Sequence, residues 1–135
     1  MSKKKPLVLD TEKIPYFPMG EGGDKVIVDA ETMTMDLGYI EPGQIVREHS
    51  HPPEQIGYAL EGECELEIDG VTYLLRKGYS WHIPSESRHE WRNVSEERFY
   101  FIDAFSPRRE DLRSGIMDIE KWSKHGQGEP ESKDS

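Results

Sequence analysis

The fold of this chain is decided by residues Gly43 to Gly62, which read GQIVREHSHPPEQIGYALEG. Within this stretch His49 and His51 are two positions apart. In a β-strand that spacing places both imidazoles on the same side, because side chains alternate between the two faces of the sheet. We therefore expect a strand that presents two histidine side chains together.

The two prolines that follow, Pro52 and Pro53, predict a bend after this strand. Each proline fixes φ and lacks the N–H that a sheet ladder needs. Gln55 then opens the next strand, close enough to offer a third ligand at the same point. A fourth ligand has to come from a distant part of the chain, and His89 is the candidate.

The composition indicates one acidic domain. The chain has 135 residues, of which 34% are hydrophobic and 33% charged, and its formal net charge is −10. This length can bury a core without a disulfide framework, and the charge argues against nucleic acid or an anionic membrane as the partner. Cys64 is the single cysteine, and the start of the chain, with Lys3 to Lys5, lacks the apolar run of a secretory signal. We expect a cytoplasmic protein.

Short alternating segments separated by turn residues predict an all-β sandwich or barrel. Asp69 and Gly70 form one such turn, which is typical of a two-residue hairpin. The expected strands cover residues 25–30, 32–40, the histidine-bearing segment after Gly43, and then 56–60, 63–68, 71–75, 79–83, 89–93 and 99–105.

The faces of three strands follow from their alternation. The apolar residues at positions 33, 35, 37 and 39 indicate a half-buried strand whose apolar side faces the core. Cys64 and Leu66 are expected in the core, with the glutamates between them in solvent. In the last strand, one face carries Phe99, Phe101, Asp103 and Phe105.

The remainder of the chain is expected to be less regular. We predict an N-terminal arm over residues 1–24 with a short strand near Leu7 to Leu9, a β-barrel over 25–107, a C-terminal helix over 108–122 and a disordered tail over 123–135. The arm, rich in proline and glycine, and the small barrel favour a homodimer.

Two spaced motifs in this sequence resemble those of the cupin family. The first contains Gly43, His49, His51, Gln55 and Gly62, and the second contains Gly78, Pro84, His89 and Asn93. The resemblance implies a jelly-roll barrel with a divalent metal ion inside. The positions that hold the metal in the family correspond here to His49, His51, Gln55 and His89.

Two positions depart from the family pattern: Gln55 replaces the usual glutamate, and Glu86 stands where a glycine is expected. Glu54 is an alternative carboxylate ligand, although Gln55 has the family spacing. A glutamine leaves the metal with four neutral ligands, which favours a stronger Lewis acid and non-oxidative chemistry. Histidine nitrogens with one amide oxygen accommodate nickel, zinc, iron, manganese or cobalt.

The end of the last strand carries a further pattern, DAFSPRRED, from Asp103 to Asp111. An aspartate that points inward among phenylalanines is costly without a purpose, and a nearby arginine can bind a carboxylate through two parallel hydrogen bonds. This pattern resembles the KdgF-type cupins of pectin and alginate breakdown, which convert 4,5-unsaturated monouronates to linear keto acids. The resemblance implies that Asp103, Phe105 and Arg109 lie beside the metal and a small anionic substrate.

Other interpretations of the same residues stay open. The chain is also compatible with a metal-dependent dioxygenase, with a zinc cupin that cyclises or isomerises a polyketide-like substrate, and with a non-catalytic sugar-binding or small-ligand-binding cupin. Asp103 can instead cap a turn, and Arg108 and Arg109 can pair with Glu110 and Asp111 on the surface. The sequence does not decide which of the two arginines would bind a substrate.

Overall fold

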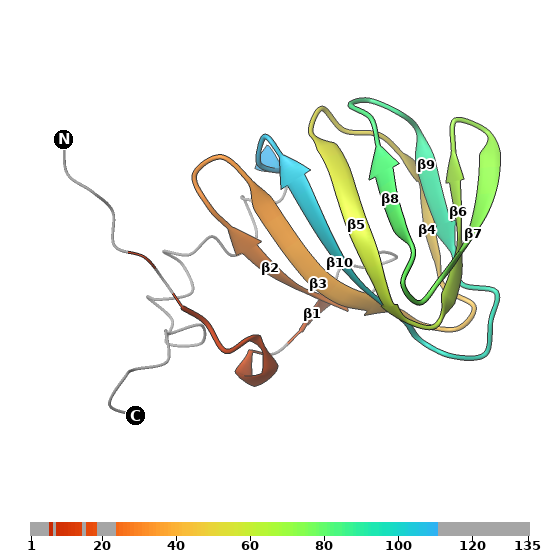
Figure 1. Cartoon of the computed structure of the whole chain (residues 1–135), viewed down its shortest axis with the longest axis horizontal. Coiled ribbons are helices and arrows are strands. Elements are labelled where there is room, and N and C mark those ends of the chain that lie inside the picture. The colour runs from red at the N-terminus through yellow and green to blue at the C-terminus, as the bar shows by residue number, and fades with distance from the viewer. Residues whose placement is uncertain (1–5, 7, 15, 19–23, 111–135) are drawn as a thin grey trace.

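Two antiparallel β-sheets face each other in the computed structural model of the chain (Figure 1). The structure describes residues 6, 8–14, 16–18 and 24–110. A short 3-10 helix, η1 (Thr11–Lys13), precedes the strands. The strands of the described residues are β1 (Phe17–Pro18), β2 (Asp24–Asp29), β3 (Thr34–Ile40), β4 (Ile45–His49), β5 (Glu54–Glu61), β6 (Glu63–Ile68), β7 (Val71–Arg76), β8 (Ser80–Ile83), β9 (His89–Arg92) and β10 (Phe99–Ser106).

The strand order mixes distant parts of the chain. The first sheet has the order β1-β2-β3-β10-β5-β8, and the second has the order β4-β9-β6-β7. Chain neighbours β4 and β5 therefore lie in different sheets, and the proline-containing connection between them crosses from one sheet to the other. The predicted all-β jelly-roll fold is confirmed, and each predicted strand between residues 25 and 105 corresponds to one of β2 to β10.

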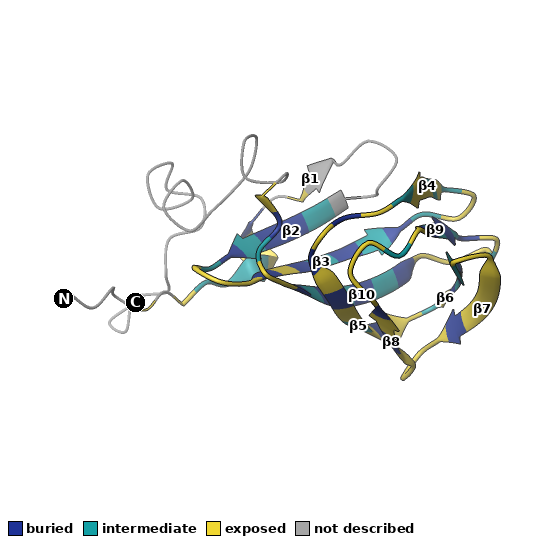
Figure 2. Ribbon diagram, turned by 90° about the horizontal axis from the view of Figure 1, so that it is seen from above, coloured by how far each residue is buried: buried dark blue, intermediate teal, exposed yellow. Residues whose placement is uncertain are grey.

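The core fills the space between the two sheets. Figure 2 shows buried and exposed residues alternating along the strands, as expected when one face of each sheet points inward. The indole rings of Trp81 and Trp91 meet edge to face with centroids 5.2 Å apart. The buried core cluster consists of Ile40, Ala59, Cys64, Leu66, Leu75, Trp81, Ile83, Trp91, Phe99 and Phe101.

The predicted inner face of β3 is wrong. Thr34 and Asp36 point inward and are buried, whereas Met35 on the opposite face is 37% exposed. The apolar outer face has a partner of its own, because Ile14 packs there against Val26, with Leu37 beside them. Leu37 on β3 thus packs beside the N-terminal segment, and the polar Thr34 and Asp36 face the interior.

The two ends of the chain lie largely outside the described residues. In the predicted strand at residues 7–9, a single bridge residue, Leu9, is assigned. The predicted helix over 108–122 and tail over 123–135 lie outside the description from residue 111 onward. Within the described ranges, the chain has no helix with the length and apolar character needed to cross a membrane.

Candidate metal centre and pocket

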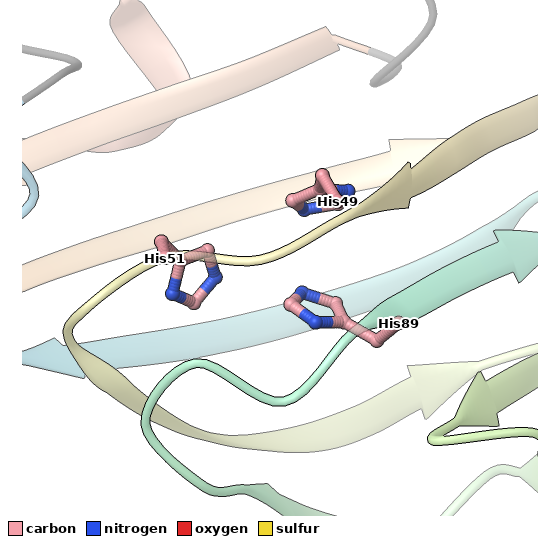
Figure 3. A group of neighbouring side chains, drawn as sticks. All are labelled: His49, His51 and His89. Atoms are coloured by element: carbon pink, nitrogen blue, oxygen red, sulfur yellow. The ribbon is translucent and has the colours of Figure 1, made fainter.

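Three histidine side chains meet at one end of the barrel, and we call them the histidine cluster: His49, His51 and His89. His49 is the last residue of β4, His51 lies in the connection to β5, and His89 begins β9 as the cross-strand partner of His49. Figure 3 shows the three rings facing a common space. One ring nitrogen from each lies within 4.8 Å of the other two, which is a spacing that a single metal ion can bridge.

Backbone carbonyls fix which ring nitrogen of each histidine carries the proton. Nδ1 lies 2.8 Å from the Arg47 carbonyl oxygen in His49, 2.9 Å from that of Pro53 in His51, and 2.9 Å from that of Ser87 in His89. A carbonyl oxygen only accepts hydrogen bonds, so Nδ1 must donate, and Nε2 keeps its lone pair. A hydrogen bond from the second ring nitrogen is the usual way in which proteins orient metal-binding histidines.

Gln55 provides the test of whether the site fits a cation. Its Oε1 lies 3.2 Å from His51 Nε2, and its amide donates a hydrogen bond to the Asp103 carboxyl, which fixes the orientation of the amide. The oxygen and the unprotonated ring nitrogen are then two acceptors that face each other. His89 Nε2 is also buried and has no hydrogen-bond partner among the described residues. This donor set, three imidazole nitrogens and one amide oxygen, fits a divalent metal ion.

Two imidazoles of this cluster, those of His51 and His89, are held neutral by their surroundings. Burial lowers the pKa of His89 to about 4, and burial and the Arg109 guanidinium lower the pKa of His51. Neutral imidazole is the form that binds a metal. Glu54, the alternative carboxylate ligand, is exposed and lies 3.0 Å from His82, so it contributes no charge to the cluster.

Asp103 lies deep inside the barrel on β10. Its side chain is 3% exposed and accepts a hydrogen bond of 2.9 Å from Trp81 Nε1. Burial and the neighbouring Asp36 carboxyl raise its pKa above the ordinary value. Gly57, its cross-strand partner on β5, makes this contact possible, because a Cβ at Gly57 would clash with both Asp103 Oδ1 and the Trp81 ring.

Two further charged residues complete this side of the interior, and together with Asp103 they form the charged cluster: Lys25, Asp36 and Asp103. Asp36 pairs with Asp103 across β3 and β10 and is fully buried. The Lys25 ammonium on β2 lies 3.3 Å from Asp36 Oδ2. The sequence analysis missed Lys25 and Asp36, and the signal that could have found them is the acidic residue in the middle of a strand that is otherwise apolar.

The two arginines after β10 have different positions. Arg108 lies 3.1 Å from Asp29 Oδ2 and donates a hydrogen bond of 3.0 Å to the Glu31 carbonyl oxygen. Arg109 is buried, and its guanidinium carbon lies 4.8 Å from the centroid of the Phe105 ring. The Phe105 ring in turn meets the His51 ring edge to face, with centroids 5.5 Å apart. Of the two arginines, Arg109 faces the histidine cluster.

A pocket whose outline encloses about 320 Å³, with the open solvent at its mouth included, joins these groups. Ile40, Val46, Trp91, Phe101 and Phe105 form its apolar wall. The structure thus brings together the residues that the sequence analysis selected as ligands or site residues, with His51 directly behind the Phe105 wall. Their roles in binding stay predictions. The polar residues that line the pocket are Lys25, His49, Gln55, His89, Asp103 and Arg109.

Comparisons with known proteins agree with this architecture. The model of the cupin domain family matches residues 36–105. The chain is 34% identical over 127 residues to polyketide synthase CurC from Streptomyces cyaneus, which covers 89% of this chain and 82% of that protein. It is 28% identical over 103 residues to the pectin degradation protein KdgF from Dickeya dadantii (strain 3937), covering 75% of this chain and 93% of that protein.

The solved structures give the same fold. KdgF from Halomonas sp. superimposes with a TM-score of 0.73 at 24% identity, covering 80% of this chain and 99% of that one. At this identity the likeness concerns the fold alone. The family match, which spans all three residues of the histidine cluster, and the 34% identity to CurC together show that this chain belongs to the cupin family.

Proposed function

We propose that this protein is a metal-dependent enzyme that opens the ring of 4,5-unsaturated monouronates and converts them to linear keto acids. The observation that carries the proposal is that one pocket beside the histidine cluster is lined by both a buried carboxyl, Asp103, and a buried guanidinium, Arg109. The similarity to a pectin degradation protein supports this substrate class.

The metal would be held by His49, His51, His89 and Gln55. When bound there, a divalent ion would act as a Lewis acid on a substrate oxygen, and four neutral ligands would leave its double charge undiminished. The protein part of the site provides a rigid frame, since the ring orientation of each histidine is fixed by a backbone carbonyl. The apolar wall around it excludes water.

Arg109 would bind the substrate carboxylate. A guanidinium presents parallel N–H donors that match the two oxygens of a carboxylate. The Phe105 ring supports the guanidinium at 4.8 Å, and burial strengthens the electrostatic attraction. The substrate would therefore be oriented with its acid group at Arg109 and its ring toward the histidine cluster.

Asp103 would transfer the proton. Its raised pKa favours the protonated acid, which can donate to carbon and be restored by the enol hydroxyl. In the reaction the C1 hydroxyl proton moves to the ring oxygen while the C1–O bond breaks, and the resulting C5 enol then gains a proton at C4 and loses its hydroxyl proton. Atoms and electrons balance within the substrate, so the conversion needs no oxidant or reductant.

The test is an assay of unsaturated monouronate with the metal-loaded protein, followed by loss of the ultraviolet absorbance of the conjugated double bond. We expect Asp103→Asn to lower kcat by about 100-fold or more, with the metal content unchanged. Equal rates for the variant and the parent would remove Asp103 from the mechanism. No turnover by the parent, with one metal ion bound, would refute the proposed reaction.

The two arginines provide a matched pair for the same assay. Arg109→Gln is expected to raise KM by about 10-fold or more, because the substrate carboxylate loses a charged partner. Arg108→Gln is expected to leave KM unchanged, since Arg108 contacts Asp29 outside the pocket. The reverse result would assign the carboxylate to Arg108.

A second candidate, ring formation in a polyketide-like substrate, is favoured by the 34% identity to polyketide synthase CurC. The uronate reaction is preferred because Arg109 and Asp103 on the pocket wall match a substrate carboxylate and a proton-transfer step. Incubation with a linear poly-β-ketone and mass spectrometry of the products would distinguish the two. Ring-closed product, with no change in the uronate, would favour this candidate.

A further inference from the structure

Lys25 is a pocket residue to which neither the family motifs nor the proposed reaction gives a role. It lies on β2, opposite Gly38 of β3, and its side chain reaches the same pocket as His49, Gln55 and Arg109. The ammonium lies 5.8 Å from the centroid of the Phe101 ring, and the side chain is 18% exposed. A lysine from the strand next to β3 is thus directed into the barrel and not toward solvent.

The Lys25–Asp36 ion pair carries a high desolvation cost at this position. Asp36 is fully buried, and neither of its oxygens has a hydrogen bond from the described residues, so the ammonium at 3.3 Å compensates its charge. Apolar side chains of similar size generally stabilise a fold at least as much as a buried ion pair does. Stability therefore does not account for the pair, and its position on the pocket wall directs attention to ligand binding.

The geometry leaves Lys25 able to bind a second group. An ammonium has three N–H donors and no acceptor, and Asp36 lies on one side of it. Lys25 also lines the pocket together with Phe101 and Asp103, and its ammonium lies over the Phe101 ring. Donors that point into a small and partly closed pocket are well placed to bind an oxygen of a ligand.

The two cations of the pocket occupy different ends. The Arg109 guanidinium lies 4.8 Å from the centroid of the Phe105 ring, which contacts the His51 ring, so it lies at the histidine cluster. The Lys25 ammonium lies 3.3 Å from Oδ2 of Asp36, the cross-strand partner of Asp103, so it lies at the charged cluster. A ligand that carries a single carboxylate would reach only one of these two ends, and a second oxygen on the ligand could reach the other.

We propose that Lys25 is a substrate-binding residue that donates a hydrogen bond to a second oxygen of the substrate, while Arg109 holds the carboxylate. The inference rests on the proposed function for the identity of the site, and it assigns a residue to the end of the substrate opposite the carboxylate. The ligand is a carboxylic acid with a hydroxyl or carbonyl oxygen at its far end. Simple monocarboxylates of the same charge lack the group that Lys25 binds.

The experiment measures binding to the metal-loaded protein by the change in its tryptophan fluorescence, to which Trp91 in the pocket wall contributes. Two probes are compared: D-galacturonate, which has hydroxyl groups opposite its carboxylate, and propionate, which has none. The test variant is the double substitution Lys25→Met with Asp36→Asn, because Lys25→Met alone would leave a buried carboxylate without its cation. The control is Asp36→Asn alone, which keeps the ammonium.

We expect the double variant to bind galacturonate about 10-fold to 100-fold more weakly than the parent, as for the loss of a hydrogen bond to a charged group. Propionate affinity should change by less than about 3-fold in both variants, and Asp36→Asn should keep galacturonate affinity within the same limit. Equal weakening for both probes, unchanged galacturonate affinity, or no galacturonate binding by the parent would overturn the inference.

Turnover separates this inference from the proposed function. If the parent does not convert unsaturated monouronate but galacturonate binding still depends on Lys25, the reaction is wrong and the role of Lys25 stands. If the parent converts unsaturated monouronate and the double variant does so with unchanged KM, the reaction stands and the role of Lys25 is wrong. Metal content and circular dichroism of each variant show that the fold is retained.

Discussion

The barrel interior holds two polar clusters that respond to burial in opposite ways. In the histidine cluster, burial lowers the pKa values of His51 and His89 and keeps both rings unprotonated. In the charged cluster, burial raises the pKa of Asp103 and favours its protonated form. One physical cause, the penalty on a charge removed from water, thus favours unprotonated imidazoles in one place and a protonated carboxyl in the other.

The largest expected effect tests the histidine cluster alone. His89→Ala removes one of three clustered imidazoles and should weaken the affinity for a divalent ion by at least about 100-fold, because changes to groups that merely orient a ligand already cost about 10-fold to 100-fold. The matched control is His82→Ala, since His82 is exposed and pairs with Glu54. Isothermal titration with zinc or nickel measures both. Equal losses in the two variants would contradict the assigned cluster.

A second substitution disturbs the charged cluster without changing any charge. Gly57→Ala should lower the free energy of unfolding by about 3 kcal/mol, because its new Cβ clashes with Asp103 Oδ1 and the Trp81 ring. Gly70→Ala is the control: its φ is +86°, so it carries backbone strain, but nothing lies within 4 Å of the added Cβ. Chemical denaturation and the uronate assay should show lost activity for Gly57→Ala only.

The smallest effect concerns the pH dependence of stability in the metal-free protein. His89 has a folded-state pKa of about 4 and an ordinary value of 6.5, so the unfolded chain binds more protons between them. His89 therefore makes the fold more stable as pH rises, by about 2 kcal/mol between about pH 5 and about pH 7. Asp103 acts in the opposite direction, because its folded pKa lies above the ordinary 3.8 and the folded state keeps its proton longer.

His89→Asn and Asp103→Asn should change the pH dependence of the unfolding free energy in opposite directions. In His89→Asn, the change in unfolding free energy from about pH 5 to about pH 7 should be lower than in the parent by about 2 kcal/mol. In Asp103→Asn it should be higher than in the parent. Urea denaturation at both pH values, with chelator present, gives these differences. A shift of the same sign in both variants would show that burial does not act on the clusters as described.

The histidine cluster could be predicted because its information is local. His49, His51 and Gln55 lie within seven consecutive residues, and strand alternation with a proline bend is enough to direct them to one point. The strands could be predicted equally well from the sequence, because turn residues separate them clearly. The assignment of His89 to the histidine cluster depended on the second family motif, because the pairing of β4 with β9 joins distant parts of the chain.

The charged cluster could not be predicted, because it depends on register between distant strands. Asp36 meets Asp103 only through the pairing of β3 with β10, and no local pattern specifies that pairing. The error on β3 has a related cause: alternation assigns the apolar face to the core, but the segment around Ile14 supplies a second apolar layer outside the barrel. The interior was then free to hold polar side chains.

The contacts of Arg108 and Arg109 connect the pocket to a surface hairpin. Arg108 is fixed to Asp29 and to the Glu31 carbonyl, and the backbone N–H of Arg109 donates to Thr34 Oγ1 at 3.0 Å. The turn between β2 and β3 therefore acts as a mount for the guanidinium that reaches into the barrel. A change in the length of that turn would alter how far Arg109 extends, and so which acid fits, while the strands and the histidines stay untouched.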